Sequence, residues 1–322
     1  MSATPLLEVR NLRVEFPTRR GTLVAVDDIS FSIAPGEVLG VVGESGAGKS
    51  LTGTAIIGLL EPPGRIGAGQ ILLEGKRIDN LPAEAMRRIR GKQIGAIFQD
   101  PLTSLNPLYS VGRQLVETMQ THLDISAGVA KKRAIELLQS TGIQAAAQRI
   151  EHYPHQFSGG MRQRVVIALA LAAEPKLVIA DEPTTALDVS IQAQIIALLK
   201  KLCRDHGTAV MLVTHDMGVI AETADRVAVM YAGRIVEIGP VADVIHRPQH
   251  PYTVGLMGSI PSLVIECERL TQIDGAMPRL TAIPAGCAFN PRCTQVFERC
   301  RIARPELIPV LTTHAACWLH SR

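Results

Sequence analysis

The chain has 322 residues, with 33 Lys and Arg against 30 Asp and Glu, and a formal net charge of +3. This length allows a large core in one large domain or two. The near balance of charges lacks the basic excess of a nucleic-acid-binding protein, so neither DNA nor RNA is an expected partner.

Targeting signals and membrane spans are not predicted. The N-terminal stretch MSATPLLEVRNLRVEF has no basic region followed by a long apolar run, so we expect no secretory signal and a protein that stays in the cytoplasm. The longest purely apolar run, residues 165–173, is far shorter than the roughly 20 residues that cross a bilayer. We expect this run to form a buried helix.

The predicted elements begin with short apolar strands separated by turns over residues 6–42. From Lys49 onward, segments with helical spacing alternate with β-branched runs, which predicts a largely parallel α/β sheet. Residues 101–164 are mainly helical and interrupt this alternation. Pro- and Gly-rich segments follow Gly239, so we expect a boundary there that divides residues 1–240 from 241–322.

The segment GESGAGKS has the G-x-x-x-x-G-K-[ST] pattern of a phosphate-binding loop, and it lies between an apolar strand and a helix-like segment. Glycines allow backbone amides to approach a triphosphate, and the following helix supplies its positive end. We expect Lys49 to reach the β- and γ-phosphates and the Ser50 hydroxyl to ligate Mg²⁺. The predicted ATP-binding set is Gly43, Glu44, Ser45, Gly46, Ala47, Gly48, Lys49, Ser50 and Leu51.

Two carboxylates end the apolar run LVIADE, as in a buried strand that delivers acids to a site at its C-terminal end. Asp181 would hold Mg²⁺ through water, and Glu182 would act as the general base on the attacking water. Taken alone, the same run is more typical of an ordinary strand with solvated charges at its end.

A second anion site is indicated by FSGGMRQR, where a serine and two glycines directly precede a helix. The segment resembles the signature of the ATP-binding cassette (ABC) family, usually Leu-Ser-Gly-Gly-Gln, with Phe157 and Met161 as departures. The resemblance implies that Ser158, Gly159 and Gly160 contact the γ-phosphate.

The ABC resemblance implies a P-loop NTPase of the α/β class. Its parts would be a β-rich N-terminal subdomain, a RecA-like parallel-sheet core, a helical signature subdomain over about residues 101–164, and a small Cys-rich C-terminal extension. Gln99 resembles the Q-loop glutamine that senses Mg²⁺ and water, and Asp188 and His215 resemble the D-loop aspartate and the switch histidine. Phe16 stands where the family has an aromatic residue on adenine, although a core position explains it equally well.

The segments QDPLTSLNP and HRPQHPYTVGLMGSIP narrow the resemblance to the D-type ATPase subunits of oligopeptide/dipeptide importers, over essentially the whole chain. This resemblance implies a second, similar ATPase subunit packed head to tail, two membrane-spanning permease subunits and, indirectly, an extracytoplasmic peptide-binding protein. It places the protein on the cytoplasmic face of the bacterial inner membrane. Dipeptides or oligopeptides are the favoured cargo, with glutathione or nickel complexes as alternatives.

Four of the six cysteines, Cys287, Cys293, Cys300 and Cys317, lie in the last 36 residues with spacing C-x5-C-x6-C-x16-C. Stable disulfides are disfavoured in a reducing cytoplasm. Four thiolates suit either Zn²⁺ or a [4Fe–4S] cluster, and the spacing does not choose between them. The importer resemblance favours iron–sulfur.

The remaining cysteines, Cys203 and Cys267, are expected as unligated thiols. Three arginines lie next to Cys293 and Cys300 in the sequence: Arg292, Arg299 and Arg301. We expect them either to be solvated or to offset the negative charge of a cluster.

Two other functions compete with import. A soluble ABC ATPase of DNA repair or translation usually shows tandem cassettes, long coiled coils or inserted zinc modules, and the sequence has none of these. An exporter is disfavoured because the sequence shows no fused membrane domain.

Overall fold

The computed structural model describes residues 4–184, 189–259 and 272–321. The chain divides into two compact units, which are described separately. The first comprises Met1–Leu6, Ile33–Glu37 and Asn80–Val213, and the second comprises Leu7–Ser32, Val38–Asp79 and Thr214–Arg322. Asp188 and Cys267, both singled out above, lie outside the described residues.

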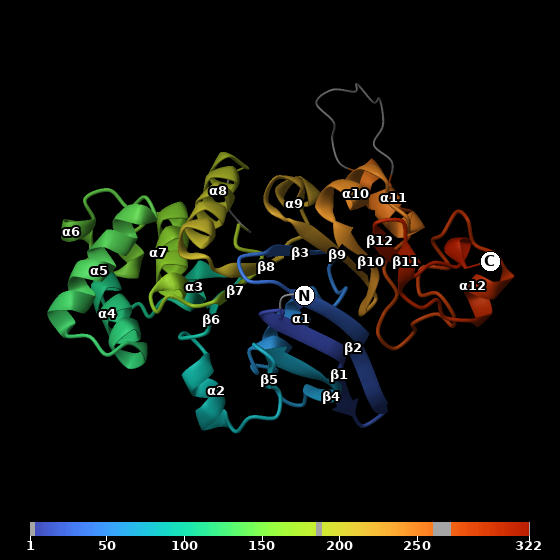
Figure 1. The fold of residues 1–322 in the computed structure, drawn as a ribbon, viewed down its shortest axis with the longest axis horizontal. Helices are drawn as coiled ribbons and strands as arrows, with labels where there is room; N and C mark the ends of the chain where they lie inside the picture. Colours follow the sequence, from blue (N-terminus) through green and yellow to red (C-terminus); the bar gives the residue numbers. More distant parts are fainter. Residues whose placement is uncertain (1–3, 185–188, 260–271, 322) are drawn as a thin grey trace. The chain divides into compact units, whose positions relative to one another are not determined.

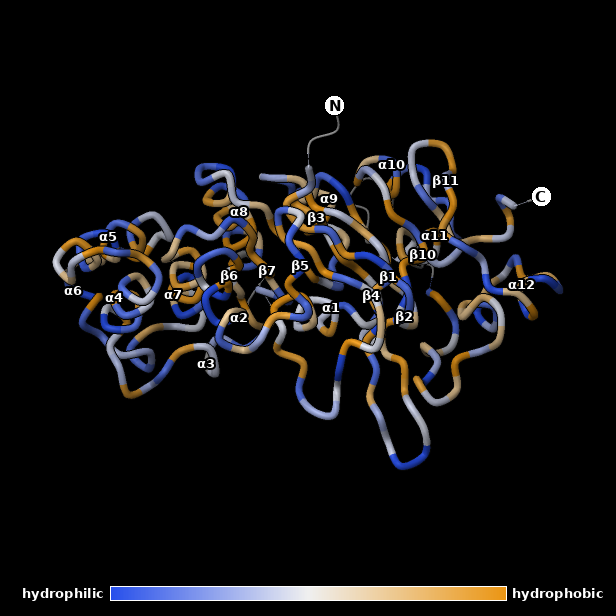
Figure 2. The backbone as a smooth tube through the Cα atoms, turned by 60° about the horizontal axis from the view of Figure 1, so that its bottom comes forward, coloured by the Kyte–Doolittle hydropathy of each residue, from blue (hydrophilic) through white to orange (hydrophobic). Residues whose placement is uncertain are grey.

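Three parallel strands form the sheet of the first unit: β6 (Ile94–Ile97), β7 (Leu177–Asp181) and β8 (Ala209–Val213). In register, Ile94 faces Leu177, and Leu177 faces Ala209. Nearly every residue of these strands is apolar and buried, and β6 and β7 are mostly orange in Figure 2. Continuous apolar runs are typical of parallel strands covered on both faces, as predicted for LVIAD.

The rest of this unit is mainly helical, with α2 before β6 and most of the other helices between β6 and β7. The helices are α2 (Ala83–Ile89), α3 (Pro101–Ser104), α4 (Val111–His122), α5 (Ala127–Ser140), α6 (Ala146–Arg149), the short 3-10 helix Pro154–Gln156, α7 (Gly159–Leu171) and, after β7, α8 (Val189–His206). Helices α4, α5, α6 and α7 gather at one end of the unit, drawn in green in Figure 1. Ser110 and Ser126 cap α4 and α5 by accepting hydrogen bonds from Arg113 N and Val129 N. The apolar run from Val165 lies mostly within α7 and is largely buried, which confirms the helix prediction.

A four-stranded sheet begins the second unit, in the order β2-β1-β4-β5. Its strands are β1 (Leu7–Thr18), β2 (Gly21–Ile33), β4 (Arg65–Leu73) and β5 (Lys76–Arg77). β1 pairs antiparallel with β4, and Leu7, Leu12 and Val14 of β1 are fully buried. The prediction of a β-rich beginning is confirmed.

The second sheet of this unit is mixed rather than parallel. β3 (Val38–Val42) runs parallel to β9 (Arg226–Tyr231), whereas β10 (Arg234–Pro240), β12 (Thr313–Ala315) and β11 (Ile308–Val310) continue it antiparallel. Only Ala232 and Gly233 connect β9 to β10, both with positive φ. A two-residue turn joins antiparallel strands, since a parallel neighbour requires a long crossover. The parallel pairs β6–β7 and β7–β8 of the first unit and β3–β9 of the second confirm the parallel part of the expectation, whereas the antiparallel β10, β12 and β11 were not expected.

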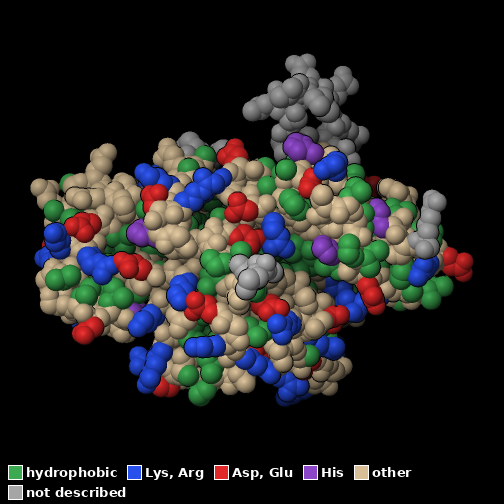
Figure 3. Space-filling model, in the orientation of Figure 1, with side chains coloured by type: hydrophobic (Ala, Val, Ile, Leu, Met, Phe, Trp, Pro, Cys, Tyr) green, Lys and Arg blue, Asp and Glu red, His purple; other side chains and the backbone are tan. Residues whose placement is uncertain are grey.

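The helices of the second unit are α1 (Lys49–Ile56), α9 (Met217–Thr223), α10 (Val241–His246), α11 (Pro251–Gly258), α12 (Glu298–Ile302) and the 3-10 helix Trp318–His320. Among the helices that the structure describes, none is both long and apolar enough to cross a membrane. On the face drawn in Figure 3, basic and acidic side chains are interspersed, so no single-sign patch dominates it.

Candidate nucleotide site

The phosphate-loop candidate connects β3 to α1 in the second unit, which is the strand–loop–helix context that its pattern requires. Gly48 precedes α1 with φ 98°, a left-handed conformation that favours glycine. An added Cβ on Gly43 would lie 2.2 Å from Met230 O, so no side chain fits there. Ser45, Gly46 and Ser50 are exposed, whereas Ala47 is buried and Leu51 half-buried.

Lys49 is held inside this loop. Its Nζ donates hydrogen bonds to Gly43 O at 2.8 Å and Glu44 O at 3.0 Å, and the residue is 5% exposed. A lysine ammonium and the N-terminus of α1 thus lie at one short turn. This combination suits a phosphate group, because both the charge and the amides at a helix N-terminus favour an anion.

Phe16 lies on β1 and is half-buried. Its ring packs against the backbone of Gly64, where an added Cβ would lie 2.7 Å from Phe16 Cε1. A half-buried ring accommodates both interpretations from the sequence, so the adenine contact stays a prediction.

The two acidic residues lie where the sequence predicted them, at the C-terminal end of β7 in the first unit. Asp181 is the last residue of the strand, and Glu182 follows with φ 45°. The Glu182 amide donates to Val213 O at 2.9 Å, and its carboxylate accepts a 2.9 Å hydrogen bond from Gln99 Nε2. The structure therefore brings together the candidate base and the Q-loop candidate, a contact that the sequence did not reveal.

The segment FSGG opens α7 in the same unit. Ser158 is the N-cap, its Oγ accepts from Met161 N at 3.4 Å, and Gly159 and Gly160 form the first turn. Both departures from the usual signature have a local explanation. Phe157 fills a buried apolar position, and the Met161 sulfur accepts a hydrogen bond from Arg149 Nη1 at 3.2 Å.

His215 is exposed and follows β8 in the chain. The preceding Thr214 donates its amide to Val41 O at 3.2 Å, and the following Asp216 caps α9 through Gly218 N and Val219 N. Hydrogen bonds thus hold the backbone on both sides of His215. They fix the position from which its side chain projects.

Comparison with known proteins decides the family. The family model described as ABC transporter matches residues 26–185, and the one described as Oligopeptide/dipeptide transporter, C-terminal region, matches residues 236–300. The oligopeptide transport ATP-binding protein OppD of Escherichia coli (strain K12) is 49% identical over 303 residues, covering 94% of this chain and 90% of that protein. OppD of Bacillus subtilis (strain 168) is 50% identical over 319 residues, covering 98% and 89%. The chain belongs to the ABC transporter ATP-binding family.

Solved structures agree with this assignment. The ATP-binding cassette MJ0796 bound to ADP and Pi superposes with a TM-score of 0.66 at 28% identity, over 73% of this chain and 98% of that one. The ABC transporter component cbiO1 from Clostridium perfringens gives 0.66 at 29% identity, over 76% and 92%. The predicted cassette fold is confirmed, and the chain is an ABC ATPase that hydrolyses ATP.

The four C-terminal cysteines of this ABC ATPase lie near one another without forming a metal site. Within residues 4–184, 189–259 and 272–321, no three His, Cys, Asp or Glu side chains are arranged to hold a metal ion. The pKa of the Cys287 thiol is raised to about 11, mainly by burial; the amide of Phe289 opposes this shift, and the neighbouring Cys317, Cys300 and Cys293 add to it. Within these described residues, the four cysteines therefore do not have the arrangement of the expected metal site.

The other cysteine and arginine expectations have separate outcomes. Cys203 is buried in α8, and burial raises the pKa of its thiol to about 12, in accord with an unligated thiol. Arg299 lies over the Trp318 ring at 3.6 Å, and Arg301 is exposed. Arg292 is neither solvated nor directed to the cysteines, because its side chain is 7% exposed and pairs with Glu44. No sequence signal links these two residues, which lie 248 positions apart.

Proposed function

We propose that this chain is the ATPase motor of an ABC importer for oligopeptides or dipeptides. The observation that carries the proposal is the combination of 49% identity to an oligopeptide transport ATP-binding protein with a C-terminal region that matches the oligopeptide/dipeptide transporter model. The C-terminal match is the stronger support for a peptide importer, because the motifs in the first 240 residues are common to ABC cassettes of many functions. It also supports a division of the chain into residues 1–240 and 241–322.

Each motif has a proposed role in hydrolysis. Lys49 and the amides that open α1 hold the phosphates of ATP, with Phe16 on adenine. Ser50, and Asp181 through a water, would hold Mg²⁺, which would supply positive charge beside the phosphates. Glu182 accepts the proton of the attacking water, since a carboxylate at a strand end can serve as general base. Gln99 orients Glu182 through their observed hydrogen bond, and His215 completes the set.

A second, similar ATPase subunit is the proposed partner at the nucleotide. Ser158 and Gly159 are exposed at the beginning of α7, where their hydroxyl and amide can reach an anion from another molecule. The related cassette MJ0796 is described as dimeric. We propose a head-to-tail pair in which each ATP lies between one phosphate loop and the partner's signature, with Asp188 near the same contact.

The surface beside Gln99 is proposed to receive the membrane-spanning permease subunits. Phe98 is 40% exposed, although large aromatic side chains are usually buried. It borders a groove of about 350 Å³ in the first unit, also lined by Gly95, Thr103 and Leu169. A permease segment in this groove would contact the residue next to Gln99, which couples transport to hydrolysis. With this arrangement we propose that the protein lies on the cytoplasmic face of the inner membrane, with the peptide-binding protein on the other side.

A [4Fe–4S] cluster is proposed for Cys287, Cys293, Cys300 and Cys317, with Zn²⁺ as the alternative. The donor set fits in kind and number, since both groups take four thiolates. Three backbone amides point at these sulfurs two residues along the chain: Phe289 toward Cys287, Gln295 toward Cys293 and Leu319 toward Cys317. Such hydrogen bonds stabilise thiolates. The four side chains would turn toward one another to hold the group.

The transport proposal is tested by ATPase assays on the assembled complex in liposomes. The binding protein is added empty or loaded with a dipeptide, an oligopeptide, glutathione or a nickel complex. Stimulation by peptide-loaded binding protein supports the proposal, whereas stimulation only by another cargo replaces it. Recovery of nucleic acid or ribosomes rather than permease subunits in a pulldown would favour the soluble class.

The metal proposal is tested separately on the chain alone, purified without oxygen. Iron, acid-labile sulfide and zinc are measured in the wild type and in Cys293→Ser. Near-equal iron and sulfide that are lost in the variant support the cluster, and zinc without sulfide supports the alternative.

A further inference from the structure

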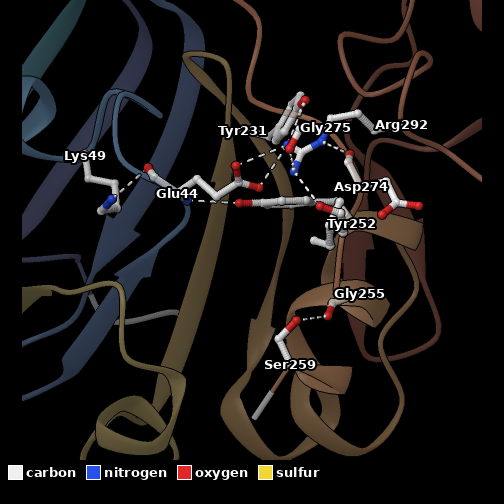
Figure 4. A network of polar contacts seen from close by, with 10 residues as sticks. Glu44, Lys49, Tyr231, Tyr252, Gly255, Ser259, Asp274, Gly275 and Arg292 are labelled. Carbon is white, nitrogen blue, oxygen red and sulfur yellow. Dashed lines mark hydrogen bonds and ion pairs between the residues drawn. The ribbon is translucent and has the colours of Figure 1, made fainter. Parts of the chain in front are cut away.

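Arg292 connects the C-terminal segment to the phosphate loop within the second unit. Its Nη1 donates to both carboxylate oxygens of Glu44, at 2.9 and 3.1 Å, and to the Tyr231 hydroxyl at 3.3 Å (Figure 4). The Arg292 side chain is 7% exposed. The arginine is therefore a buried, charged partner of a phosphate-loop residue.

Glu44 also contacts the lysine of the phosphate loop, Lys49. Its carbonyl accepts a 3.0 Å hydrogen bond from Lys49 Nζ, and its own amide donates to the Tyr252 hydroxyl at 3.0 Å. Carboxylate, carbonyl and amide of one residue are thus all engaged, as Figure 4 shows. Because Arg292 and Tyr252 hold Glu44 from one side, the position of the Lys49 ammonium depends on both.

Packed aromatic rings give this network a rigid support. Tyr231 and Tyr252 lie 4.7 Å apart, and Phe289 packs on them at 5.2 and 5.4 Å, measured between ring centroids. All three side chains are buried, as is the charge of Arg292. Removing the half-buried Glu44 carboxylate would leave the buried Arg292 charge without its partner, so the pair is sensitive to substitution.

Arg292 also holds a chain segment against the loop. Its Nε donates to Asp274 O at 2.9 Å, and its Nη2 donates to Ile273 O and Gly275 O at 3.3 Å each. Two residues further, the Met277 methyl lies 3.7 Å from where a Cβ on Gly46 would be. One guanidinium therefore organises a second contact, at the exposed part of the phosphate loop.

We propose that Arg292 is a positioning residue of the ATP site. By fixing Glu44 and the segment that carries Met277, it holds the phosphate loop and Lys49 in the shape that receives ATP. The affinity for ATP then depends on the C-terminal segment around Arg292, which the phosphate-loop motif does not include.

The test measures ATP and ADP binding to the full chain by calorimetry, and the KM and kcat of ATP hydrolysis in the assembled complex. Arg292→Gln should weaken ATP binding about tenfold, the size of effect typical when one member of a coupled network is removed. KM should rise by a similar factor with kcat within about twofold, because the loop binds phosphate before and during reaction. Arg292→Lys keeps the charge and should recover part of the affinity.

Arg304→Gln is the matched control. Arg304 belongs to the same C-terminal segment and pairs with Asp27 and Asp28 rather than with the phosphate loop. Its loss should leave ATP affinity unchanged. Wild-type affinity in Arg292→Gln, or an equal loss in Arg304→Gln, would overturn the proposal.

A double-mutant comparison separates positioning from general stability. If Arg292 acts through Glu44, the pair Arg292→Gln with Glu44→Gln should bind ATP no more weakly than the weaker single variant. Losses that simply add would overturn the proposal. Should Arg292→Gln fail to fold, Glu44→Gln removes the negative charge and one acceptor of the same contact from the loop side and should also weaken ATP binding about tenfold. Unchanged affinity there would count against the role.

Discussion

The side-chain amide of Gln99 donates a 2.9 Å hydrogen bond to the carboxylate of Glu182, although 83 positions separate the two residues. The contact follows from strand order. Gln99 comes two residues after β6, Glu182 comes directly after β7, and these strands are parallel neighbours. Their carboxyl ends meet at one edge of the sheet, so the groups that follow them are brought together.

Glu182→Gln should bind ATP with wild-type affinity and hydrolyse it about 10²–10⁴-fold more slowly, the contribution typical of a general base. An amide of the same shape cannot accept the proton of water. Single-turnover hydrolysis in the assembled complex, beside ATP binding to the chain, measures both quantities. Near-normal turnover in this variant would show that another group removes the proton.

Lys49→Ala should weaken ATP binding at least about tenfold, since hydrogen bonds to charged groups contribute about 1.5–3 kcal/mol each. The phosphates lose the cation that Gly43 O and Glu44 O hold in the loop. Calorimetric titration with ATP gives the affinity. Lys76→Ala, in the exposed strand β5, is a suitable control and should bind ATP normally. Equal affinities in both variants would contradict the phosphate-loop assignment.

Gly43→Ala should abolish ATP binding and lower stability by more than about 1 kcal/mol, because its Cβ would lie 2.2 Å from Met230 O. Gly75→Ala provides the comparison. Gly75 has a similar need for positive φ, 77°, but open space around it, so only the conformational cost remains. Thermal unfolding and ATP titration of both variants distinguish steric exclusion from backbone strain. Comparable behaviour of the two proteins would argue against the close approach.

Folding stability should decrease as the pH falls from about 6.5 toward 3. The pKa of His250 is lowered to about 3, mainly by burial and also by nearby His320, and its Nδ1 accepts a 3.0 Å hydrogen bond from Tyr252 N. Below about pH 6.5, His250 binds a proton in the unfolded chain but stays neutral in the folded chain. The stabilising contribution of this histidine is therefore complete above about pH 6.5. Below that pH it decreases by about 1.4 kcal/mol per pH unit.

His250→Asn isolates that contribution, since asparagine caps a helix without titrating. Burial raises the pKa of Glu237, which acts in the opposite direction by costing stability as the pH rises through its folded pKa. It is present in both proteins, so the difference between their urea unfolding curves from about pH 4 to 7 reports on His250. Identical pH slopes would refute the assignment.

Much of the site could be predicted because its determinants are local. The loop around Lys49, the strand ending at Asp181 and the serine that caps α7 each reveal themselves within eight consecutive residues. Their backbone needs are also local: Gly48 has a left-handed φ, and Ser158 accepts from the first turn of its helix. Features that depend only on neighbouring residues can be predicted from the local sequence.

The remaining features depend on contacts between distant segments. Glu44 is a variable position of the loop pattern, and Arg292 is one of several arginines beside cysteines, so neither indicates the other. The antiparallel strand after β9 is a departure from the largely parallel sheet that the sequence predicts. Ala232 and Gly233 lie inside an apolar run that looks continuous, and only their positive φ values reveal a reversal.

The edge of β10 has a practical consequence. Ile238 and Glu237 of β10 pair with His314 and Ala315 of β12, so residues beyond 300 cover a strand that lies before residue 241. A protein truncated near residue 240 would leave the backbone donors and acceptors of that strand open to pairing with other molecules. Expression of the cassette alone should therefore yield self-associating material, and separate study of its ATPase activity requires the covering hairpin to be kept.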